Sequence, residues 1–159
     1  MKVKILSKYA TLPTLGSIDA AGYDLYAAIP DVEIDNGRYR GQIEIPPHET
    51  RLIPTGIAID IGSGFWGGIY ARSGLATKQG LRPANCVGVI DSDYRGEIMV
   101  ALHNDTNEFR YVYCGDRIAQ LVFHQTAHLV SNENGEIWQV VDELSETDRG
   151  EGGFGSTGI

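Results

Sequence analysis

Cysteine and basic residues are scarce in this sequence. Cys86 and Cys114 are the two cysteines among 159 residues, which excludes a metal site built from cysteines alone. Their strand-like surroundings predict buried, reduced thiols, in keeping with a cytosolic protein. Thirteen lysines and arginines against 21 aspartates and glutamates give a formal net charge of −8. This charge argues against non-specific nucleic-acid binding, which requires a basic surface.

Long apolar runs and familiar catalytic motifs are also missing. No apolar run is long enough for a membrane span, and we expect no signal peptide. No G-x-S-x-G motif supports a serine hydrolase. We therefore expect a cytoplasmic protein, or one in the host cytosol if its source is a virus.

What the sequence does contain is many short alternating segments separated by turn-forming residues, with almost no helical periodicity. They predict an all-β fold, a jelly-roll-like barrel or sandwich with one short helix. Asn36-Gly37 predicts a hairpin that joins 32–34 to 42–45. A helical turn is expected at 73–78 with Ser73 as its cap, and residues 9–17 are expected to form a loop. The other predicted strands are 1–6, 20–27, 57–61, 65–70, 100–104, 109–113, 118–123, 127–130 and 138–141.

The segment 85–102 has two apolar runs around an acidic, turn-forming centre. β-Branched residues favour a strand up to Ile90, and an apolar strand resumes at Ile98. We expect a β-hairpin with the Asp91 carboxylate at its base and the Tyr94 ring on its far arm. A carboxylate beside an apolar concavity suits a general base next to a bound ring.

Two arginines stand in positions that suit anion binding. Arg72 precedes Ser73 and Gly74 at a strand-to-helix junction, and Arg149 opens a glycine-rich tail. Arginine and backbone N–H groups bind phosphate oxygens well. A capped helix with a surface arginine is an equally acceptable interpretation of the first position.

The chain is polar from Ser145 onward and has no apolar run of its own there. This predicts a flexible C-terminal arm, or an arm that docks onto a subunit. Phe154 among glycines favours an arm that closes over a flat ligand. His124 and His128 are four residues apart, but strand-like sequence around them disfavours a metal site.

Five segments, in order, resemble the five motifs of the trimeric dUTPase family, the dUTP nucleotidohydrolases. The segments are 21–25, 71–76, 88–96, 115–121 and 149–158. The resemblance implies a jelly-roll homotrimer with active sites at subunit interfaces. It implies hydrolysis of dUTP to dUMP and pyrophosphate with Mg²⁺, which keeps uracil out of DNA and supplies dUMP for dTMP synthesis. No nucleic-acid or membrane partner is expected.

The resemblance also implies roles for individual residues. Asp91 would activate water against the α-phosphate, Tyr94 would pack under the deoxyribose, and Asp24 would orient Mg²⁺ through water. Contacts to uracil would come from Asn85, Gly88, Val89, Ile90 and Met99. Phosphate contacts would come from Arg72, Ser73, Gly74 and Gln120. A neighbouring subunit's arm would add Arg149, Phe154, Gly155 and Ser156. Residues 1–144 would then form the jelly-roll domain and 145–159 the arm.

The sequence departs from the family pattern at two places. Ala71 stands where the family usually has proline, and residues 31–45 form a longer, more polar hairpin than in many members. A dCTP deaminase, or a bifunctional deaminase and dUTPase, is the nearest alternative on this fold, and the segment 90–94 favours the hydrolase. A non-enzymatic interaction protein is a second alternative, which the intact Asp24, Asp91, Arg72 and Arg149 disfavour.

Overall fold

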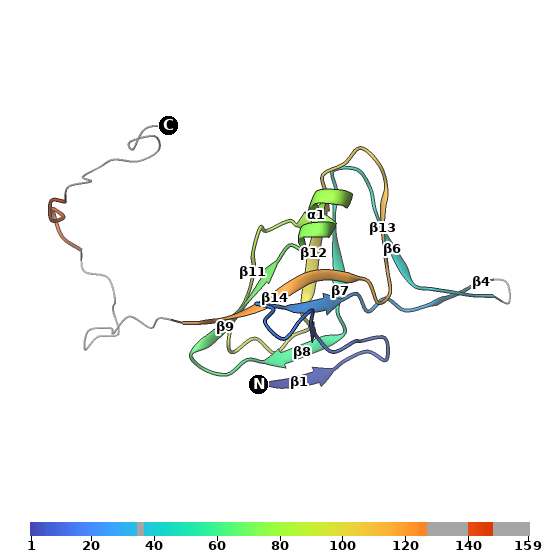
Figure 1. Ribbon diagram of the computed structural model, residues 1–159, viewed down its shortest axis with the longest axis horizontal. Helices are drawn as coiled ribbons and strands as arrows, with labels where there is room; N and C mark the ends of the chain where they lie inside the picture. Colours follow the sequence, from blue (N-terminus) through green and yellow to red (C-terminus); the bar gives the residue numbers. More distant parts are fainter. Residues whose placement is uncertain (35–36, 127–139, 148–159) are drawn as a thin grey trace. The chain divides into compact units, whose positions relative to one another are not determined.

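The computed structural model describes residues 1–34, 37–126 and 140–147 (Figure 1). The chain divides into two units, 1–127 and 128–159, and the fold described below is that of the first unit. The predicted strand 127–130 lies outside the described residues, as do 138 and 139 of the predicted strand 138–141, whose described residues 140 and 141 are not in a strand. Among the described residues, no helix has the length and apolarity needed to cross a membrane.

The described part of the first unit is built from short antiparallel strands and one short helix, which confirms the all-β, jelly-roll-like class. The elements are β1 (Lys2–Ile5), β2 (Thr14–Leu15), β3 (Tyr23–Tyr26), β4 (Val32–Ile34), β5 (Gly37–Tyr39), β6 (Gln42–Ile45), β7 (Thr50–Pro54), β8 (Ile57–Asp60), β9 (Phe65–Tyr70), α1 (Ser73–Gln79), β10 (Leu81–Pro83), β11 (Gly88–Ile90), β12 (Met99–Asn104), β13 (Arg110–Tyr113) and β14 (Arg117–Gln125).

Two sheets enclose the hydrophobic core. The larger has the order β11-β9-β14-β3-β2 and the smaller β10-β12-β7, while β1-β8, β13-β6 and β4-β5 form separate pairs. Ile69 and Leu121 of the larger sheet belong to the same buried cluster as Ile53 and Leu102 of the smaller one. Burying one such side chain contributes roughly 1.5–3 kcal/mol. Inward-facing residues of the alternating strands therefore hold the two sheets together.

A buried asparagine secures the end of β12. Asn104 is fully buried, and its amide donates to the carbonyls of Ile45 at 2.9 Å and Glu108 at 2.7 Å. Its side-chain oxygen accepts the N–H of Thr106 at 2.9 Å. These bonds join β12, β6 and the turn before β13, so one side chain replaces backbone pairing where the strands separate.

The predicted hairpin at 85–102 is wrong. β11 pairs with β9, with Gly88 opposite Ile69, whereas β12 pairs with β7 and β10. Residues 91–98 therefore cross from one sheet to the other (Figure 1). The physical reason is burial: Ile90 and Val100 both enter the common core, and they do so from opposite sheets.

The predicted pairing of 32–34 with 42–45 is also wrong. β4 pairs with β5, with Ile34 opposite Gly37, while β6 pairs with β13. The partner of β4 is therefore the polar segment 37–39, which has too few apolar residues to be recognised by alternation.

The N-cap of the helix lies one residue earlier than predicted. Arg72 occupies the N-cap position with an extended backbone, and Ser73 is the first helical residue. No side chain caps this end, so the prediction of a Ser73 cap is wrong. At the other end, Gly80 has φ of 65° and its N–H donates to the carbonyls of Ala76 and Leu75, a left-handed cap that suits glycine.

Other differences concern short strands and the cysteines. β2, β7 and β10 were not predicted, and they are short or contain a proline, which weakens a strand pattern. Cys86 is exposed with φ of 60°, and Cys114 is half-buried. The expectation of two buried thiols is therefore wrong: Cys86 lies in the turn before β11, not within a strand.

Candidate active site

A cavity of about 290 Å³ lies beside strand β11. Nine residues line it, namely Ile69, Asn85, Gly88, Val89, Ile90, Asp91, Tyr94, Glu97 and Met99. All seven residues expected at the base, the sugar and the attacking water are among them. Ile69 and Glu97 were not anticipated, because neither carries a distinctive chemical signal in the sequence.

The position of β11 suits recognition through the backbone. Within the described sheets, β11 is an edge strand whose neighbour is β9. One row of its N–H and C=O groups therefore has no strand partner in that sheet and is available to a ligand. A planar ring with donors and acceptors along one edge would complement such a strand.

Asp91 follows β11 directly and is exposed. Its main-chain carbonyl accepts the N–H of Tyr94 at 3.2 Å, which forms the turn after the strand. Among the described residues, no hydrogen bond or ion pair occupies its carboxylate. Both carboxylate oxygens therefore stay free to accept a proton at the edge of the cavity.

Tyr94 packs against its own turn. The hydroxyl donates to the main-chain carbonyl of Glu97 at 3.0 Å, and a β-carbon at Gly96 would overlap that hydroxyl. Glycine at 96 thus allows the ring to fold over the backbone. The ring is held at both ends, which makes it a defined wall of the cavity.

A second group of predicted residues gathers around Asp24. The Asp24 carboxylate accepts two hydrogen bonds, one from Arg72 Nε at 2.8 Å and one from Arg117 Nη1 at 3.1 Å. Arg72 Nη1 also donates to the Arg117 carbonyl at 3.1 Å. Asp24 is 8% exposed, so this ion pair is shielded more than a surface pair would be.

The sheet register explains this arrangement. β14 lies between β3 and β9, and Gln120 is opposite both Asp24 and Tyr70. Gln120 Nε2 donates to the Ala71 carbonyl at 3.1 Å. Arg72 follows β9 after one intervening residue, Ala71, and its side chain reaches Asp24 of β3, on the other side of β14. The structure therefore brings together the residues predicted to hold phosphate and metal, next to the exposed Ser73 and Gly74.

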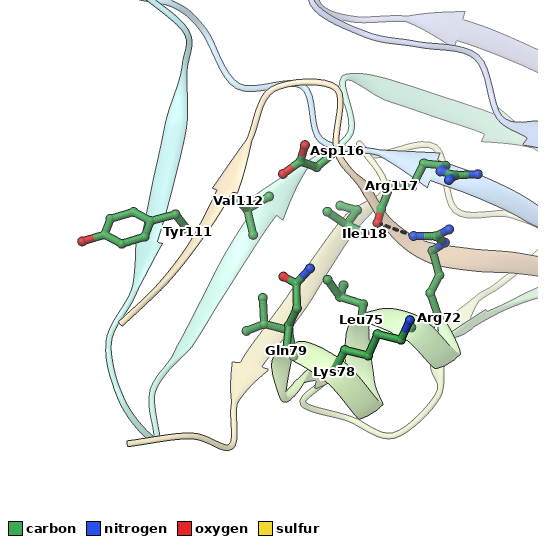
Figure 2. Close-up of a pocket in the computed structure, with 11 residues that line it drawn as sticks. Arg72, Leu75, Lys78, Gln79, Tyr111, Val112, Asp116, Arg117 and Ile118 are labelled. Carbon is green, nitrogen blue, oxygen red and sulfur yellow. Dashed lines mark hydrogen bonds between the residues drawn. The ribbon is translucent and has the colours of Figure 1, made fainter. Parts of the chain in front are cut away.

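A larger cavity, of about 430 Å³, separates α1 from the turn between β13 and β14 (Figure 2). Leu75, Val112 and Ile118 lie along its floor, while the cations Arg72, Lys78 and Arg117 also line it. Lys78 and Arg117 were not anticipated as site residues. The Arg117 contact with Asp24 spans 93 positions in the sequence, so only the pairing of β3 with β14 shows it.

Tyr111 also lines this larger cavity. A hydrogen bond to the Glu44 carboxylate raises the pKa of the Tyr111 hydroxyl above its usual value. The Tyr111 ring points away from α1 (Figure 2), and the polar side chains nearer the helix include Asp116 as well as the three cations.

No protein cage for a metal ion is present in the described ranges. Groups of three His, Cys, Asp or Glu side chains that could hold an ion do not occur there. His124 instead stacks on Trp66 with ring centroids 4.4 Å apart and bonds to the Tyr70 hydroxyl at 3.0 Å. His128 lies outside the described residues, as do Arg149, Phe154, Gly155 and Ser156.

Known proteins share this sequence along nearly its whole length. The dUTPase family model matches residues 8–158. The deoxyuridine 5′-triphosphate nucleotidohydrolase of Maricaulis maris is 43% identical, and the match covers 99% of this chain and 95% of that protein. The Candida albicans enzyme of the same name is 42% identical, over 99% of this chain and 87% of its own.

A solved structure has the same fold. A mutant of the Staphylococcus bacteriophage 80alpha dUTPase, with dUpNHpp, superposes with a TM-score of 0.80 at 27% identity, covering 99% of this chain and 98% of that one. Because sequence and fold agree along the whole chain, we conclude that this protein belongs to the dUTPase family and is a dUTP-hydrolysing enzyme.

Proposed function

We propose that Asp91 is the general base of dUTP hydrolysis. Its carboxylate takes a proton from a water molecule as the water oxygen attacks the α-phosphorus. The bond between that phosphorus and the bridging oxygen to the β-phosphate breaks, which releases dUMP and pyrophosphate. The observation that carries this proposal is a free, exposed Asp91 carboxylate in the cavity that also contains Asn85 and the edge of β11.

The same cavity supplies a basis for selecting the base. Uracil would bind to the free backbone row of Gly88–Ile90 and to the Asn85 side chain, with Met99 in apolar contact. Recognition by hydrogen bonds discriminates strongly, because a base with a different donor pattern leaves buried groups unpaired. Tyr94 would pack under the deoxyribose and leave no room for a 2′-hydroxyl.

The phosphates would bind at the second group of residues. Arg72 retains donor capacity beyond its bonds to Asp24 and Arg117, and Ser73, Gly74 and Gln120 lie close to it in the chain or the sheet. In a protein of net charge −8, a strongly anionic ligand needs such a concentration of cations. Asp24 orients two guanidinium groups at once, which pre-arranges them for phosphate.

The described residues fit Mg²⁺ that is carried mainly by the substrate. They contain no protein cage, and both Asp24 oxygens already accept from arginines. An ion that keeps several waters and binds substrate phosphates needs little more than a nearby carboxylate. Asp24 would hold such an ion through water, and the bound ion would neutralise charge on the phosphates.

We further propose that residues 1–144 act as the jelly-roll domain and 145–159 as an arm. In a homotrimer with active sites at subunit interfaces, the arm would bring Arg149, Phe154, Gly155 and Ser156 to a neighbour's site. The family match, which extends to residue 158, supports a functional role for this segment. In the cytoplasm, the reaction would keep uracil out of DNA and supply dUMP for dTMP synthesis.

One experiment tests substrate choice and reaction type together. Pyrophosphate release is measured side by side from dUTP, dTTP, dCTP and UTP with Mg²⁺, and ammonia release is measured from dCTP. We expect rapid pyrophosphate release from dUTP alone. Ammonia from dCTP would favour the deaminase alternative, and equal rates with UTP would contradict the role given to Tyr94.

A further inference from the structure

The wall of the smaller cavity that carries Tyr94 lies outside the sheets. Residues 91–98 connect β11 to β12 and belong to neither strand. Their position therefore depends on contacts to neighbouring segments. Those contacts come mainly from the turn between β7 and β8.

Glu97 makes the central contact to that turn. Its Oε1 accepts the N–H of Gly56 at 2.7 Å. Gly56 has φ of 69°, and a β-carbon there would crowd Ala10 and Ala28. The backbone at this position therefore has room only for glycine, and it presents its N–H to the carboxylate. The next residue adds two bonds: Ile98 N–H donates to the Ile57 carbonyl at 2.9 Å, and its carbonyl accepts the Thr55 hydroxyl at 2.5 Å.

The same residue determines where the Tyr94 ring lies. The Tyr94 hydroxyl donates to the Glu97 main-chain carbonyl at 3.0 Å, and the ring folds over Gly96. The ring is therefore fixed to the backbone of Glu97, and that backbone is fixed to Gly56 through the Glu97 side chain. Glu97 also lines the cavity itself.

We propose that Glu97 is a positioning residue for sugar discrimination, acting through Tyr94. This rests on the proposed role of Tyr94 in excluding the 2′-hydroxyl. Exclusion by contact depends on distance, and a displacement of about 1 Å is enough to change such a site. Without the bond to Gly56, the 94–97 turn keeps only the exposed Arg95–Asp60 pair and the bonds of the neighbouring Ile98, and the Tyr94 ring is then free to move away from the sugar.

The carboxylate could instead serve stability alone, by satisfying the Gly56 N–H. The two roles give different results, because loss of stability lowers activity toward all nucleotides equally. Sugar discrimination is the ratio of kcat/KM for dUTP to kcat/KM for UTP, and it changes only if the ring moves. This ratio is therefore the measurement that separates the roles.

The test compares Glu97→Met with Glu97→Gln. Methionine has a similar length but cannot accept a strong hydrogen bond, whereas glutamine keeps a side-chain oxygen for Gly56. We expect Glu97→Met to lower the dUTP-to-UTP ratio by at least about tenfold, corresponding to about 1.4 kcal/mol of discrimination. Glu97→Gln should stay within about threefold of the wild type.

The matched control removes another tether of the same turn. Asp60 accepts Arg95 Nη2 at 2.9 Å, in an exposed pair. Asp60→Asn should leave the ratio unchanged, because exposed pairs contribute little. If Glu97→Met does not fold, Glu97→Asp draws the carboxylate back by one methylene group and should lower the ratio partially.

Two results would overturn the proposal. An unchanged ratio in folded Glu97→Met or Glu97→Asp would limit Glu97 to stability, and a Glu97→Gln defect as large as that of Glu97→Met would assign the effect to charge. Tyr94→Ala is measured in parallel. If Tyr94→Ala does not hydrolyse UTP, the role proposed for Tyr94 itself is wrong. If Tyr94→Ala hydrolyses UTP but Glu97→Met keeps the wild-type dUTP-to-UTP ratio, only the Glu97 proposal is contradicted.

Discussion

Asp91 and Asp24 are both aspartates of the candidate site, but their surroundings differ completely. Asp91 is exposed, and its carboxylate has no partner among the residues that the structure describes. Asp24 is 8% exposed and is bound by two arginines. The Asp91 carboxylate is open to a water molecule, whereas the Asp24 carboxylate accepts hydrogen bonds from two guanidinium groups and orients them. The surroundings therefore assign different roles to the same residue type.

Replacing Asp91 by asparagine should remove the proton acceptor and keep the shape of the cavity. We expect kcat for dUTP to fall at least ~10²-fold, the usual contribution of a general base. Binding of dUpNHpp, measured by calorimetry, should stay within about threefold. Asp93→Asn is the matched control, because Asp93 is exposed in the same turn and does not line the cavity. Unchanged turnover of Asp91→Asn would remove Asp91 from this role.

At the scale of single elements, strand ends depend on side chains as much as on backbone pairing. Asn104 at the end of β12 donates to the buried carbonyl of Ile45 and to the partly buried carbonyls of Pro46 and Glu108. Replacing it with leucine would remove the donor from all three. Each such loss costs about 1–3 kcal/mol.

We therefore expect Asn104→Leu to lower the free energy of unfolding by about 2–5 kcal/mol, measured by urea denaturation. Val100→Ala in the same strand is a useful comparison, because it removes apolar volume and leaves polar groups paired. A loss for Asn104→Leu below about 1 kcal/mol would show that water satisfies the freed carbonyls.

The Arg82–Asp105 pair joins β10 to the end of β12, with Nε to Oδ2 at 2.7 Å and Nη2 to Oδ1 at 3.0 Å. Hydrogen bonding to Arg82 lowers the pKa of Asp105 below its usual value. A carboxyl whose pKa is lower in the folded state stabilises the fold fully when the pH is above its unfolded-state pKa, about 3.9 for aspartate. This stabilisation is lost as the pH falls through the folded-state pKa.

Asp105→Asn should therefore be less stable than the wild type at neutral pH, and the difference should shrink as pH falls below about 4. Thermal unfolding at a series of pH values measures this difference. A gap that stays constant down to pH 2 would mean that the substitution acts through packing, not through ionisation of the pair.

The limits of sequence interpretation are clearest at this same scale. Asp91 and Tyr94 were singled out from the segment itself, whereas the other five cavity residues were predicted through the resemblance to the dUTPase family. The pairing of the two apolar runs was not predictable. Such runs can pair with each other or with distant strands, and burial in the common core decides which pairing forms. The Arg117–Asp24 pair and the Glu97–Gly56 bond needed the register and the loop packing, because neither partner is near the other in sequence.

At the scale of the whole molecule, the proposed arm makes activity a property of the assembly. Deleting the chain from Arg149 should abolish pyrophosphate release from dUTP and leave a folded trimer, because this segment has few apolar residues to add to a core. Circular dichroism and light scattering check the fold and the assembly. An unfolded product would show that the segment is structural.

Mixing two inactive chains tests where the arm acts. The truncated chain keeps Asp91 but lacks the arm, and Asp91→Asn keeps the arm but lacks the base. If the arm closes over a neighbouring subunit, mixed trimers formed by refolding the two together should recover part of the wild-type activity. No recovery from verified mixed trimers would mean that each arm serves its own subunit.

The edge position of β11 has a consequence for inhibitor design. Its backbone N–H and C=O groups are the same whatever side chains the strand carries, and Val89 is already 60% exposed. An inhibitor anchored to that backbone would therefore keep its affinity when resistance mutations change side chains along the strand. An inhibitor anchored to the Asn85 side-chain amide would lose affinity after a single substitution at that position.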